Sequence, residues 1–366
     1  MNTFIEFIKN KFRWIRERPL SLPGESLPVN ITQILMNPQR ILIVPYHQMG
    51  KVLLATRVFK MIRDHYPSAQ TTVVIHGNWS ALVKGDPTID TVISFGNYID
   101  NPRSKEFQAF ARDLATRQFD LALFISSQFS EPMAYLVRLS NAQVRISFWN
   151  PINEERGYFN VGVKSPDGSR YEVDRYLDML HAVGIRGNIR DYTMAVSDSL
   201  REKARLRFLH SGVMTSPGQF VGFDLTKEFS EKPIEKKTAE YLLNVLVSHL
   251  KTQVVVFFEP GKKKLASNLK EVFGQQITLI EDRPVSMVAG LLSFCRFIVT
   301  LNTDLFQLAV ALKIPTLSLL TREEMLQWSP GEKEFLVHLE RSGNSWPSSD
   351  AIIKSVETIM QRTKKL

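Results

Sequence analysis

The sequence predicts an α/β protein made of two doubly wound domains in tandem. Short apolar runs of strand length alternate with helical patterns, first from Arg40 onward and again from about Asp198. The chain has 366 residues, 44% of them apolar, so it exceeds what one hydrophobic core usually serves. We therefore expect an amino-terminal segment of residues 1–38, a first domain of residues 39–190 and a second domain of residues 191–366.

The amino-terminal segment combines basic and apolar residues at helical spacing. Apolar side chains recur along residues 4–18, basic side chains fall on the opposite side, and Pro19 ends the pattern. A spacer with proline and glycine follows at residues 21–28. The predicted amphipathic helix suits either an anionic membrane surface or packing on the body of the protein or on a protein partner, and the sequence leaves both open.

The first domain shows strand-like runs separated by helical patterns. The expected strands are residues 41–44, 72–75, 91–94, 121–125 and 144–147. The expected helices are residues 52–65, 78–83, 105–115 and 132–139. A linking segment, residues 150–184, holds a turn at residues 166–168 and a helix that closes the domain. This alternation predicts a Rossmann-like parallel sheet.

The second domain repeats the alternation. Its expected strands are residues 220–223, 253–258, 277–280, 297–301 and 316–320. Ligands of doubly wound sheets bind beyond the carboxyl ends of the strands, near helix amino termini. We therefore expect a ligand site in a cleft between the two domains.

The loop after the first core strand is the first candidate site. Met49 and Gly50 are expected to form a tight glycine loop between that strand and the next helix. His47 and Lys51 are the titratable side chains of this loop. An imidazole with a pKa near 6.5 suits general-base catalysis, and a structural histidine is the alternative.

The charge of the chain favours an anionic partner. The formal net charge is +9 and the sequence pI is near 9.5. Lys262, Lys263 and Lys264 lie between a predicted strand and a predicted helix, where they form either an anion site or a solvated basic loop. Nucleic acid is not expected, because basic and aromatic residues do not interleave on a recognisable module.

Several classes of protein are disfavoured by the sequence. The seven histidines are scattered and no Asp-x-Asp pair occurs, so no metal site is expected. The first loop lacks Gly-x-Gly-x-x-Gly, which disfavours a dehydrogenase. The single cysteine, Cys295, lies in an apolar run and indicates a buried thiol. Without a signal peptide or a membrane-spanning run, a cytoplasmic location is expected.

Three segments together resemble a known family. Residues 41–93 contain the strand, Met49-Gly50 and Pro87-Thr88-Ile89-Asp90; residues 174–185 contain Arg175-Tyr176-Leu177; and residues 298–319 contain Asn302-Thr303-Asp304 and Lys313-Ile314-Pro315-Thr316. Their order and spacing are similar to those of the bacterial glycosyltransferases of family 9, best known as ADP-heptose:lipopolysaccharide heptosyltransferases. The resemblance covers most of residues 40–330.

The resemblance implies the fold, the substrates and a set of site residues. It implies a GT-B fold, no metal, a nucleotide-sugar donor (an ADP-sugar) and a lipopolysaccharide-core or other envelope glycan acceptor. It assigns Asn302, Thr303, Asp304 and Gln307 to the strand-loop-helix motif that binds the donor in the family. Lys232 falls near the family's donor-phosphate lysine, although a solvated lysine in a charged loop explains that position equally well.

The chain departs from the family at the positions of the family's usual active-site residues. Lys51 replaces the usual aspartate, and a protonated lysine cannot accept a proton from an acceptor hydroxyl. Asn302-Thr303-Asp304 and Gln307 replace Asp-Thr-Gly and a histidine. Asp304 puts a negative charge where glycine lets backbone amides approach a diphosphate, or else it caps its helix.

Two hypotheses follow. In the first, the protein is a glycosyltransferase at the inner face of the cytoplasmic membrane. It then works by inverting displacement, with His47 near the base position and phosphates stabilised by Lys51, Lys232 and the amides near Thr303. In the second, it is a catalytically inactive GT-B pseudoenzyme that serves as a scaffold or binding module at the membrane.

Overall fold

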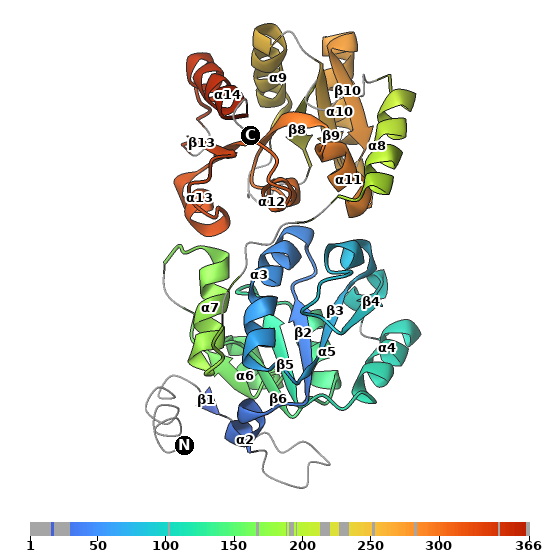
Figure 1. Ribbon diagram of the computed structural model, residues 1–366, viewed down its shortest axis with the longest axis vertical. Coiled ribbons are helices and arrows are strands. Elements are labelled where there is room, and N and C mark those ends of the chain that lie inside the picture. Colours follow the sequence, from blue (N-terminus) through green and yellow to red (C-terminus); the bar gives the residue numbers. More distant parts are fainter. Residues whose placement is uncertain are drawn as a thin grey trace. The chain divides into compact units, whose positions relative to one another are not determined.

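The chain divides into two compact units, Met1–Asp191 (unit 1) and Tyr192–Leu366 (unit 2). The computed structural model describes residues 30–101, 103–165, 168–187, 189, 194, 196–212, 220–226, 234–250, 253–281, 284–342 and 345–363; for residues 16, 17, 153–155 and 363 it describes only the backbone. Each unit holds one sheet flanked by helices (Figure 1).

The sheet of unit 1 has the strand order of a doubly wound fold. The described strands are β1 (Arg16–Glu17), β2 (Arg40–Pro45), β3 (Gln70–His76), β4 (Thr91–Phe95), β5 (Leu121–Ile125), β6 (Val144–Phe148) and β7 (Val161–Val163). They lie in the order β1-β7-β6-β5-β2-β3-β4, and only β1 is antiparallel to its neighbour. The strand order therefore reverses between β2 and β5, which is the switch point where such sheets open for ligands.

The helices of unit 1 cover its sheet and connect its strands. They are α2 (Ile31–Met36), α3 (Met49–His65), η2 (Gly77–Leu82), η3 (Asn97–Asp100), α4 (Lys105–Ala115), α5 (Glu131–Leu139), α6 (Pro151–Arg156) and α7 (Glu172–Ala182). Leu42 and Val44 pack in one core cluster with residues of α4 and α5. Ile41 and Ile43 are equally buried and, by strand alternation, point to the opposite face.

Unit 2 repeats this architecture. Its described strands are β8 (Phe220–Leu225), β9 (Val254–Phe258), β10 (Ile277–Glu281), β11 (Cys295–Thr300), β12 (Thr316–Leu320) and β13 (Leu336–Glu340). They form a parallel sheet in the order β10-β9-β8-β11-β12-β13, with the switch point between β8 and β11. Its helices are α8 (Asp198–His210), α9 (Lys236–Leu250), η4 (Pro260–Lys262), α10 (Lys263–Phe273), η5 (Gly274–Gln276), α11 (Val285–Leu292), α12 (Asp304–Ala311), α13 (Arg322–Trp328) and α14 (Ser349–Thr363).

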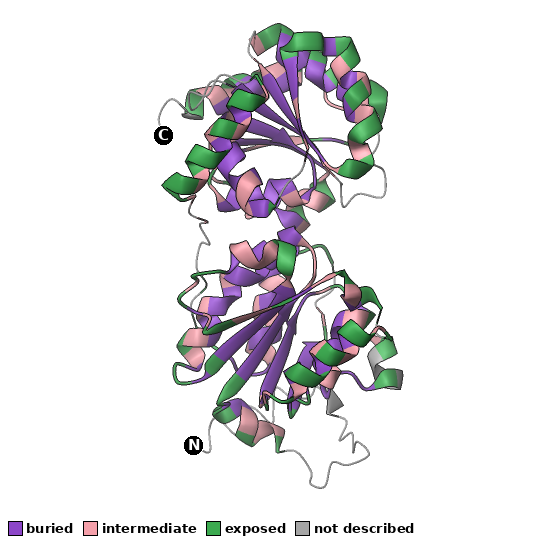
Figure 2. Ribbon diagram, turned by 90° about the vertical axis from the view of Figure 1, so that its right-hand side faces the viewer, coloured by how far each residue is buried: buried purple, intermediate pink, exposed green. Residues whose placement is uncertain are grey.

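The predicted fold class is confirmed, and the strands show why the sequence revealed it. Both faces of the central strands are covered, so β2, β5, β6, β8 and β9 are buried along almost their whole length (Figure 2). Strands buried on both faces appear in sequence as continuous apolar runs. Cys295 is buried as expected, and burial raises the pKa of its thiol.

Some local predictions were wrong. The expected glycine loop is shorter, because Met49 and Gly50 form the first turn of α3 after the N-cap Gln48. The pattern at residues 78–83 forms the 3₁₀ helix η2 instead of an α-helix. The short strand β7 and the edge strand β13 were not predicted.

The predicted helix over residues 4–18 lies outside the described residues, apart from the backbone of Arg16 and Glu17. That backbone forms β1 and pairs with β7, so these two residues are extended and not helical as predicted. The predicted turn at residues 166–168 also lies outside the described part, except for Gly168, whose φ is +81°. No helix in the described ranges is long and apolar enough to span a membrane.

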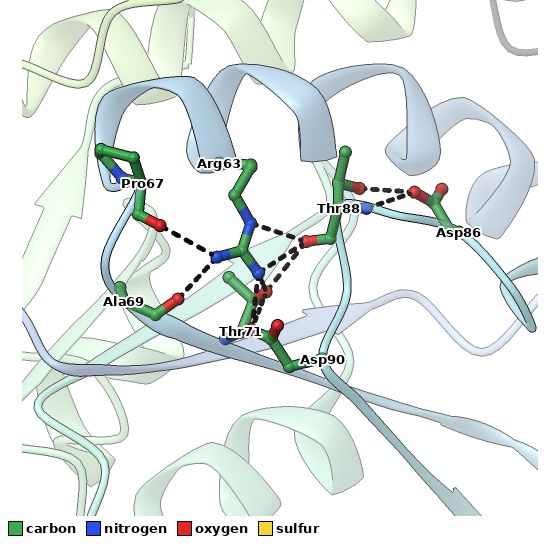
Figure 3. A network of polar contacts seen from close by, with 7 residues as sticks. All are labelled: Arg63, Pro67, Ala69, Thr71, Asp86, Thr88 and Asp90. Carbon is green, nitrogen blue, oxygen red and sulfur yellow. Dashed lines mark hydrogen bonds and ion pairs between the residues drawn. The ribbon is translucent and has the colours of Figure 1, made fainter.

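A polar network ties together the amino ends of β3 and β4 in unit 1 (Figure 3). The guanidinium of Arg63 donates to the carbonyl oxygens of Ala69 (2.8 Å) and Thr88, and its Nη2 lies 2.5 Å from Asp90 Oδ2. The backbone amide of Thr71 also donates to Asp90, at 2.7 Å. These hydrogen bonds hold the pKa of the Asp90 carboxyl below its usual value against the effect of burial.

Candidate functional site

Sequence-predicted site residues follow the strands beside each switch point. In unit 1, His47 lies in the short loop after β2, and Lys51 lies in the first turn of α3, which follows that loop. Asn302, Thr303 and Asp304 come directly after β11 in unit 2. The carboxyl ends of β2 and β11 are where doubly wound sheets place ligand-binding groups.

In unit 1, an ammonium group is buried in the first turn of α3. Lys51 is 2% exposed, and its Nζ lies 4.9 Å from the centroid of the Tyr46 ring. The His47 ring stacks on Tyr46 with a centroid distance of 4.5 Å. A cation in the first helical turn faces the positive end of the helix dipole, so its position there is electrostatically costly.

The surroundings of His47 favour its neutral form. Burial lowers the pKa of its imidazole, the charges of His76 and Lys51 lower it further, and Asp100 acts in the opposite direction. Its Nδ1 is buried and has no hydrogen-bond partner among the described residues. A neutral imidazole can accept a proton near neutral pH.

His76, in contrast, has both ring nitrogens engaged. Its Nδ1 accepts a hydrogen bond from the backbone amide of Asn78 at 3.2 Å. Its Nε2 lies 2.9 Å from Asn97 Oδ1, to which it then donates. His47 is therefore the better candidate base of the two.

In unit 2, a buried carboxylate occupies the switch point. Asp224, at the end of β8, is 1% exposed. Its Oδ1 accepts from the amide and hydroxyl of Thr226, at 2.9 and 2.7 Å, and its Oδ2 accepts from the hydroxyls of Thr300, at 2.6 Å, and Thr303. Burial raises the pKa of the Asp224 carboxyl, and these hydrogen bonds oppose that rise.

The side chain of Thr303 is fully engaged within the protein. Its hydroxyl donates to Asp224 and accepts from the amide of Phe306 at 3.2 Å, which makes Thr303 the N-cap of α12. Asp304 is the first residue of the helix, so the alternative that Asp304 caps α12 was wrong. The cap needs an extended backbone, and Thr303 has it, with φ −134° and ψ 170°.

The other predicted donor residues differ in their surroundings. Gln307 is buried, and its amide donates to the carbonyl of Trp328 at 2.8 Å. Asn302 is also buried, and its Oδ1 has no hydrogen-bond partner among the described residues. Lys232 lies outside the described residues. Lys262–Lys264 span the end of η4 and the start of α10, where Lys263 and Lys264 are exposed and Lys262 is half-buried.

Two buried carboxylates were missed by the sequence analysis. Asp224 was hidden in an apolar strand, although one acid inside such a strand is a usable signal. In unit 1, Glu172 is fully buried and accepts from the amide and hydroxyl of Ser127, at 3.2 and 2.7 Å, beyond the end of β5. Among the described side chains, no group of three or more His, Cys, Asp or Glu could hold a metal ion.

Sequence comparison identifies the family. The model of glycosyltransferase family 9 (heptosyltransferase) matches residues 107–346, about two thirds of the chain. The chain is 23% identical over 323 residues to lipopolysaccharide heptosyltransferase 3 of Escherichia coli, which covers 82% of this chain and 89% of that protein.

Solved structures share the fold. The crystal structure of the family 9 glycosyl transferase from Veillonella parvula superposes with a TM-score of 0.73 and 16% identity, covering 89% of this chain and 98% of that one. The E. coli ADP-heptose lps heptosyltransferase II gives a TM-score of 0.69 and 15% identity, with coverages of 89% and 99%. The two Rossmann-like units are thus those of the GT-B fold, and the chain belongs to glycosyltransferase family 9, the heptosyltransferase family.

Proposed function

We propose that the protein is a metal-independent glycosyltransferase that moves a sugar from an ADP-sugar to a lipopolysaccharide-core or other envelope glycan. Family membership supports the reaction type. The names of two similar proteins, a lipopolysaccharide heptosyltransferase and an ADP-heptose heptosyltransferase, support the donor and acceptor classes. The observation that carries the proposal is the position of His47, stacked on Tyr46 beyond the end of β2 at the switch point of unit 1, where burial lowers the pKa of its imidazole.

The reaction is a single displacement at the anomeric carbon. An acceptor hydroxyl oxygen forms the new bond to that carbon while the bond to the diphosphate oxygen breaks, and ADP leaves with the electron pair. His47 takes the proton of the attacking hydroxyl. The ammonium of Lys51 supports this role, because its positive charge disfavours protonation of His47 before the acceptor arrives.

Unit 2 supplies the donor side. The amides at the start of α12 carry the partial positive charge of a helix amino terminus, which suits a diphosphate. Lys232 and the lysines at residues 262–264 add positive charge in the loops after β8 and β9. The carboxylate of Asp224 opposes an anion close to Thr303, so the diphosphate contacts backbone amides rather than the Thr303 hydroxyl.

The protein acts in the cytoplasm at the inner face of the cytoplasmic membrane. The basic residues of the amino-terminal segment favour an anionic surface, where a glycolipid acceptor is found. A glycolipid acceptor in that surface would then reach unit 1.

A transfer assay tests the proposal directly. Purified protein is incubated with ADP-heptose and lipopolysaccharide of truncated core, and the product is followed by mass spectrometry as a gain of one heptose. Titration calorimetry with ADP, UDP, GDP and CDP is run alongside, with Lys232→Ala as the donor-side variant. We expect ADP to bind most tightly and the variant to bind it more weakly. Absence of binding by every nucleotide at millimolar concentration would refute the transferase.

The second candidate function is an inactive GT-B scaffold at the membrane. It is favoured by the side chains of Thr303 and Gln307, which are committed to internal hydrogen bonds instead of facing a ligand. A scaffold of this kind keeps its fold and its amino-terminal docking segment but binds no nucleotide. The same calorimetric titration therefore separates the two candidates.

A further inference from the structure

A row of aromatic rings lies beyond the carboxyl ends of β3 and β4 in unit 1. The His76 ring is 6.2 Å from Trp79 and 5.5 Å from Phe95, measured between centroids. Phe110 continues the row, with its centroid 6.3 Å from Phe95 and 5.9 Å from Tyr98. These five residues come from β3, η2, β4, η3 and α4, so the tertiary structure assembles the row from separate segments. We call it the aromatic row.

Only part of the aromatic row belongs to the core. Phe95 is 3% exposed, whereas His76, Trp79, Tyr98 and Phe110 are half-buried. Such rings pack on the protein with part of their surface and keep the rest in solvent. A group of partly exposed rings beside a candidate base is a feature of ligand sites.

The aromatic row is joined to the loop of the candidate base. The indole Nε1 of Trp79 donates to the backbone carbonyl of His47 at 3.1 Å. A ligand resting on Trp79 would therefore lie beside the residue that accepts the proton. The same hydrogen bond fixes the distance between the indole and the loop.

The charge around the aromatic row selects the kind of ligand. Asp100 is the acidic residue at this edge and acts on the charge of His47, whereas Asp86 and Asp90 belong to the network at the amino ends of β3 and β4. Asn78, Asn97 and Asp100 are exposed at this edge and offer hydrogen-bond groups for hydroxyls. The exposed carboxylate of Asp100 disfavours phosphate and other anions here, whereas an uncharged polyhydroxylated ring is suited to this edge.

We propose that the aromatic row binds a neutral sugar ring of the acceptor, with Trp79 as its stacking platform. The C–H groups on one side of a pyranose carry partial positive charge, and the face of an indole is negative. Stacking on Trp79 brings a hydroxyl of that sugar to His47, and Asp100 and the asparagines bind the remaining hydroxyls. The inference rests on the proposed function in naming the acceptor, and it assigns the acceptor's recognition to neutral rather than phosphorylated sugars.

Glycan binding in the absence of donor tests the inference separately from turnover. The probes are lipopolysaccharide core oligosaccharide freed of lipid and the same material dephosphorylated with hydrofluoric acid, titrated by ligand-observed NMR. Trp79→Leu removes the ring, whereas Trp79→Phe keeps a ring and loses the hydrogen bond to His47. Trp149→Leu is the matched control, because Trp149 is a 43%-exposed tryptophan of the same unit.

We expect the dephosphorylated oligosaccharide to bind at least as tightly as the native one. We expect Trp79→Leu to weaken binding about tenfold, and Trp79→Phe and Trp149→Leu to stay within about threefold of the wild type. Tyr98→Leu, which truncates a second ring of the row, is expected to weaken binding too and serves if Trp79→Leu does not fold.

Three results would overturn the inference: no glycan binding by the wild type, unchanged binding in both leucine variants of the row, or an equal loss in Trp79→Phe and Trp79→Leu. Glycan binding that depends on Trp79 in a protein without nucleotide binding or transfer would support the inference and refute the proposed function. Transfer activity together with glycan binding that does not depend on Trp79 would support the proposed function and refute the inference.

Discussion

The two units share one strand order but use their switch points differently. In unit 1, the strand after which the order reverses leads to His47 and Lys51, a neutral imidazole beside a buried ammonium. In unit 2, the corresponding strand carries Asp224, whose oxygens are bound by three threonines. The His47 imidazole has a buried nitrogen without a partner among the described residues, whereas the Asp224 carboxylate is saturated by internal hydrogen bonds.

This difference shows that topology places a site without deciding its chemistry. A parallel sheet brings strand ends and helix amino termini together in both units. Which polar groups stay available depends on the neighbours that burial provides. We infer that unit 1 carries the acid–base chemistry and that unit 2 contributes mainly through backbone amides and loop lysines.

The largest expected effect is at His47. The His47→Gln variant should lower kcat by about 10²- to 10⁴-fold, because glutamine cannot accept the proton. In the wild type, kcat/KM should fall only below pH 6.5, since burial lowers the pKa of the imidazole and keeps the base form present at neutral pH. Transfer rates measured from pH 5 to 8 check both points. An acid limb that persists unchanged in the variant would assign the base elsewhere.

The second prediction contrasts the amino ends of the unit 1 strands with their carboxyl ends, where the candidate site lies. Arg63→Met should lower the free energy of unfolding by about 2 kcal/mol, because it removes the charged donor of the Ala69 and Thr88 carbonyls and of Asp90. Transfer activity at 25 °C should not change, since this network lies at the amino ends of β3 and β4. Denaturant unfolding measures the stability.

Arg117→Met is the matched control for Arg63→Met. Arg117, just beyond the end of α4, forms an exposed pair with Asp113 of that helix, at 3.0 Å, and its loss should cost less than about 0.5 kcal/mol. An equal loss in the free energy of unfolding for the two variants would contradict the structural role of the Arg63 network. Lost transfer activity in a folded Arg63→Met variant would contradict the view that the amino ends of the strands take no part in function.

The third prediction concerns the closed switch point of unit 2. Thr303→Val removes the cap of α12 and one hydrogen bond to Asp224, and should lower stability by about 1–2 kcal/mol. ADP affinity should stay within about threefold, because the hydroxyl is already engaged. Unfolding and calorimetry give the two values.

Thr358→Val provides the comparison for Thr303→Val, since the Thr358 hydroxyl bonds only to the carbonyl of Lys354 in its own helix. Its cost should be small. A large loss of ADP affinity in Thr303→Val with unchanged stability would mean that the hydroxyl binds the ligand directly. The polar groups at the switch point of unit 2 would then be ligand-binding groups instead of internally bonded ones.

The smallest effect is a pH dependence of stability in unit 2. Burial lowers the pKa of His338, whose ring lies between the hydroxyls of Ser318 and Ser329. The unfolded chain therefore binds more protons below pH 6.5, and stability should fall as the pH drops through that value. His338→Gln should show a shallower fall.

The slope of stability against pH from 7.5 to 5 measures this prediction. Part of the fall should remain in His338→Gln, because burial also lowers the pKa values of His47 and His65 in unit 1. An identical slope in the variant and the wild type would show that His338 takes no part.

The strands were predictable because burial on both faces leaves a recognisable pattern within a few residues of sequence. β5 and β9 are unbroken apolar runs, as expected for strands covered on both faces. β7 has three residues with a central glycine, and β13 is a partly exposed edge strand, so neither produces such a run. The first turn of α3 was missed because Gly50 signals a loop in sequence, although glycine is tolerated near a helix start.

The site was predictable only in position. The loops after β2 and β11 were identified from the sequence, and they do follow the strands at the two switch points. The state of each side chain was not predictable, because it depends on partners far away in the chain. Thr303 appeared available for a phosphate until the fold placed Asp224, 79 positions earlier, against its hydroxyl.

The sequence by itself determined the alternation of strands and helices, the division into two α/β units and the likeness to a family, since these rest on periodicity and on the order of local segments. The tertiary structure decided which polar groups are buried, which are paired, and which rings meet in one row. The reason is physical: hydrophobic periodicity is encoded within a few residues, whereas burial and hydrogen bonding depend on groups that only the folded chain brings together.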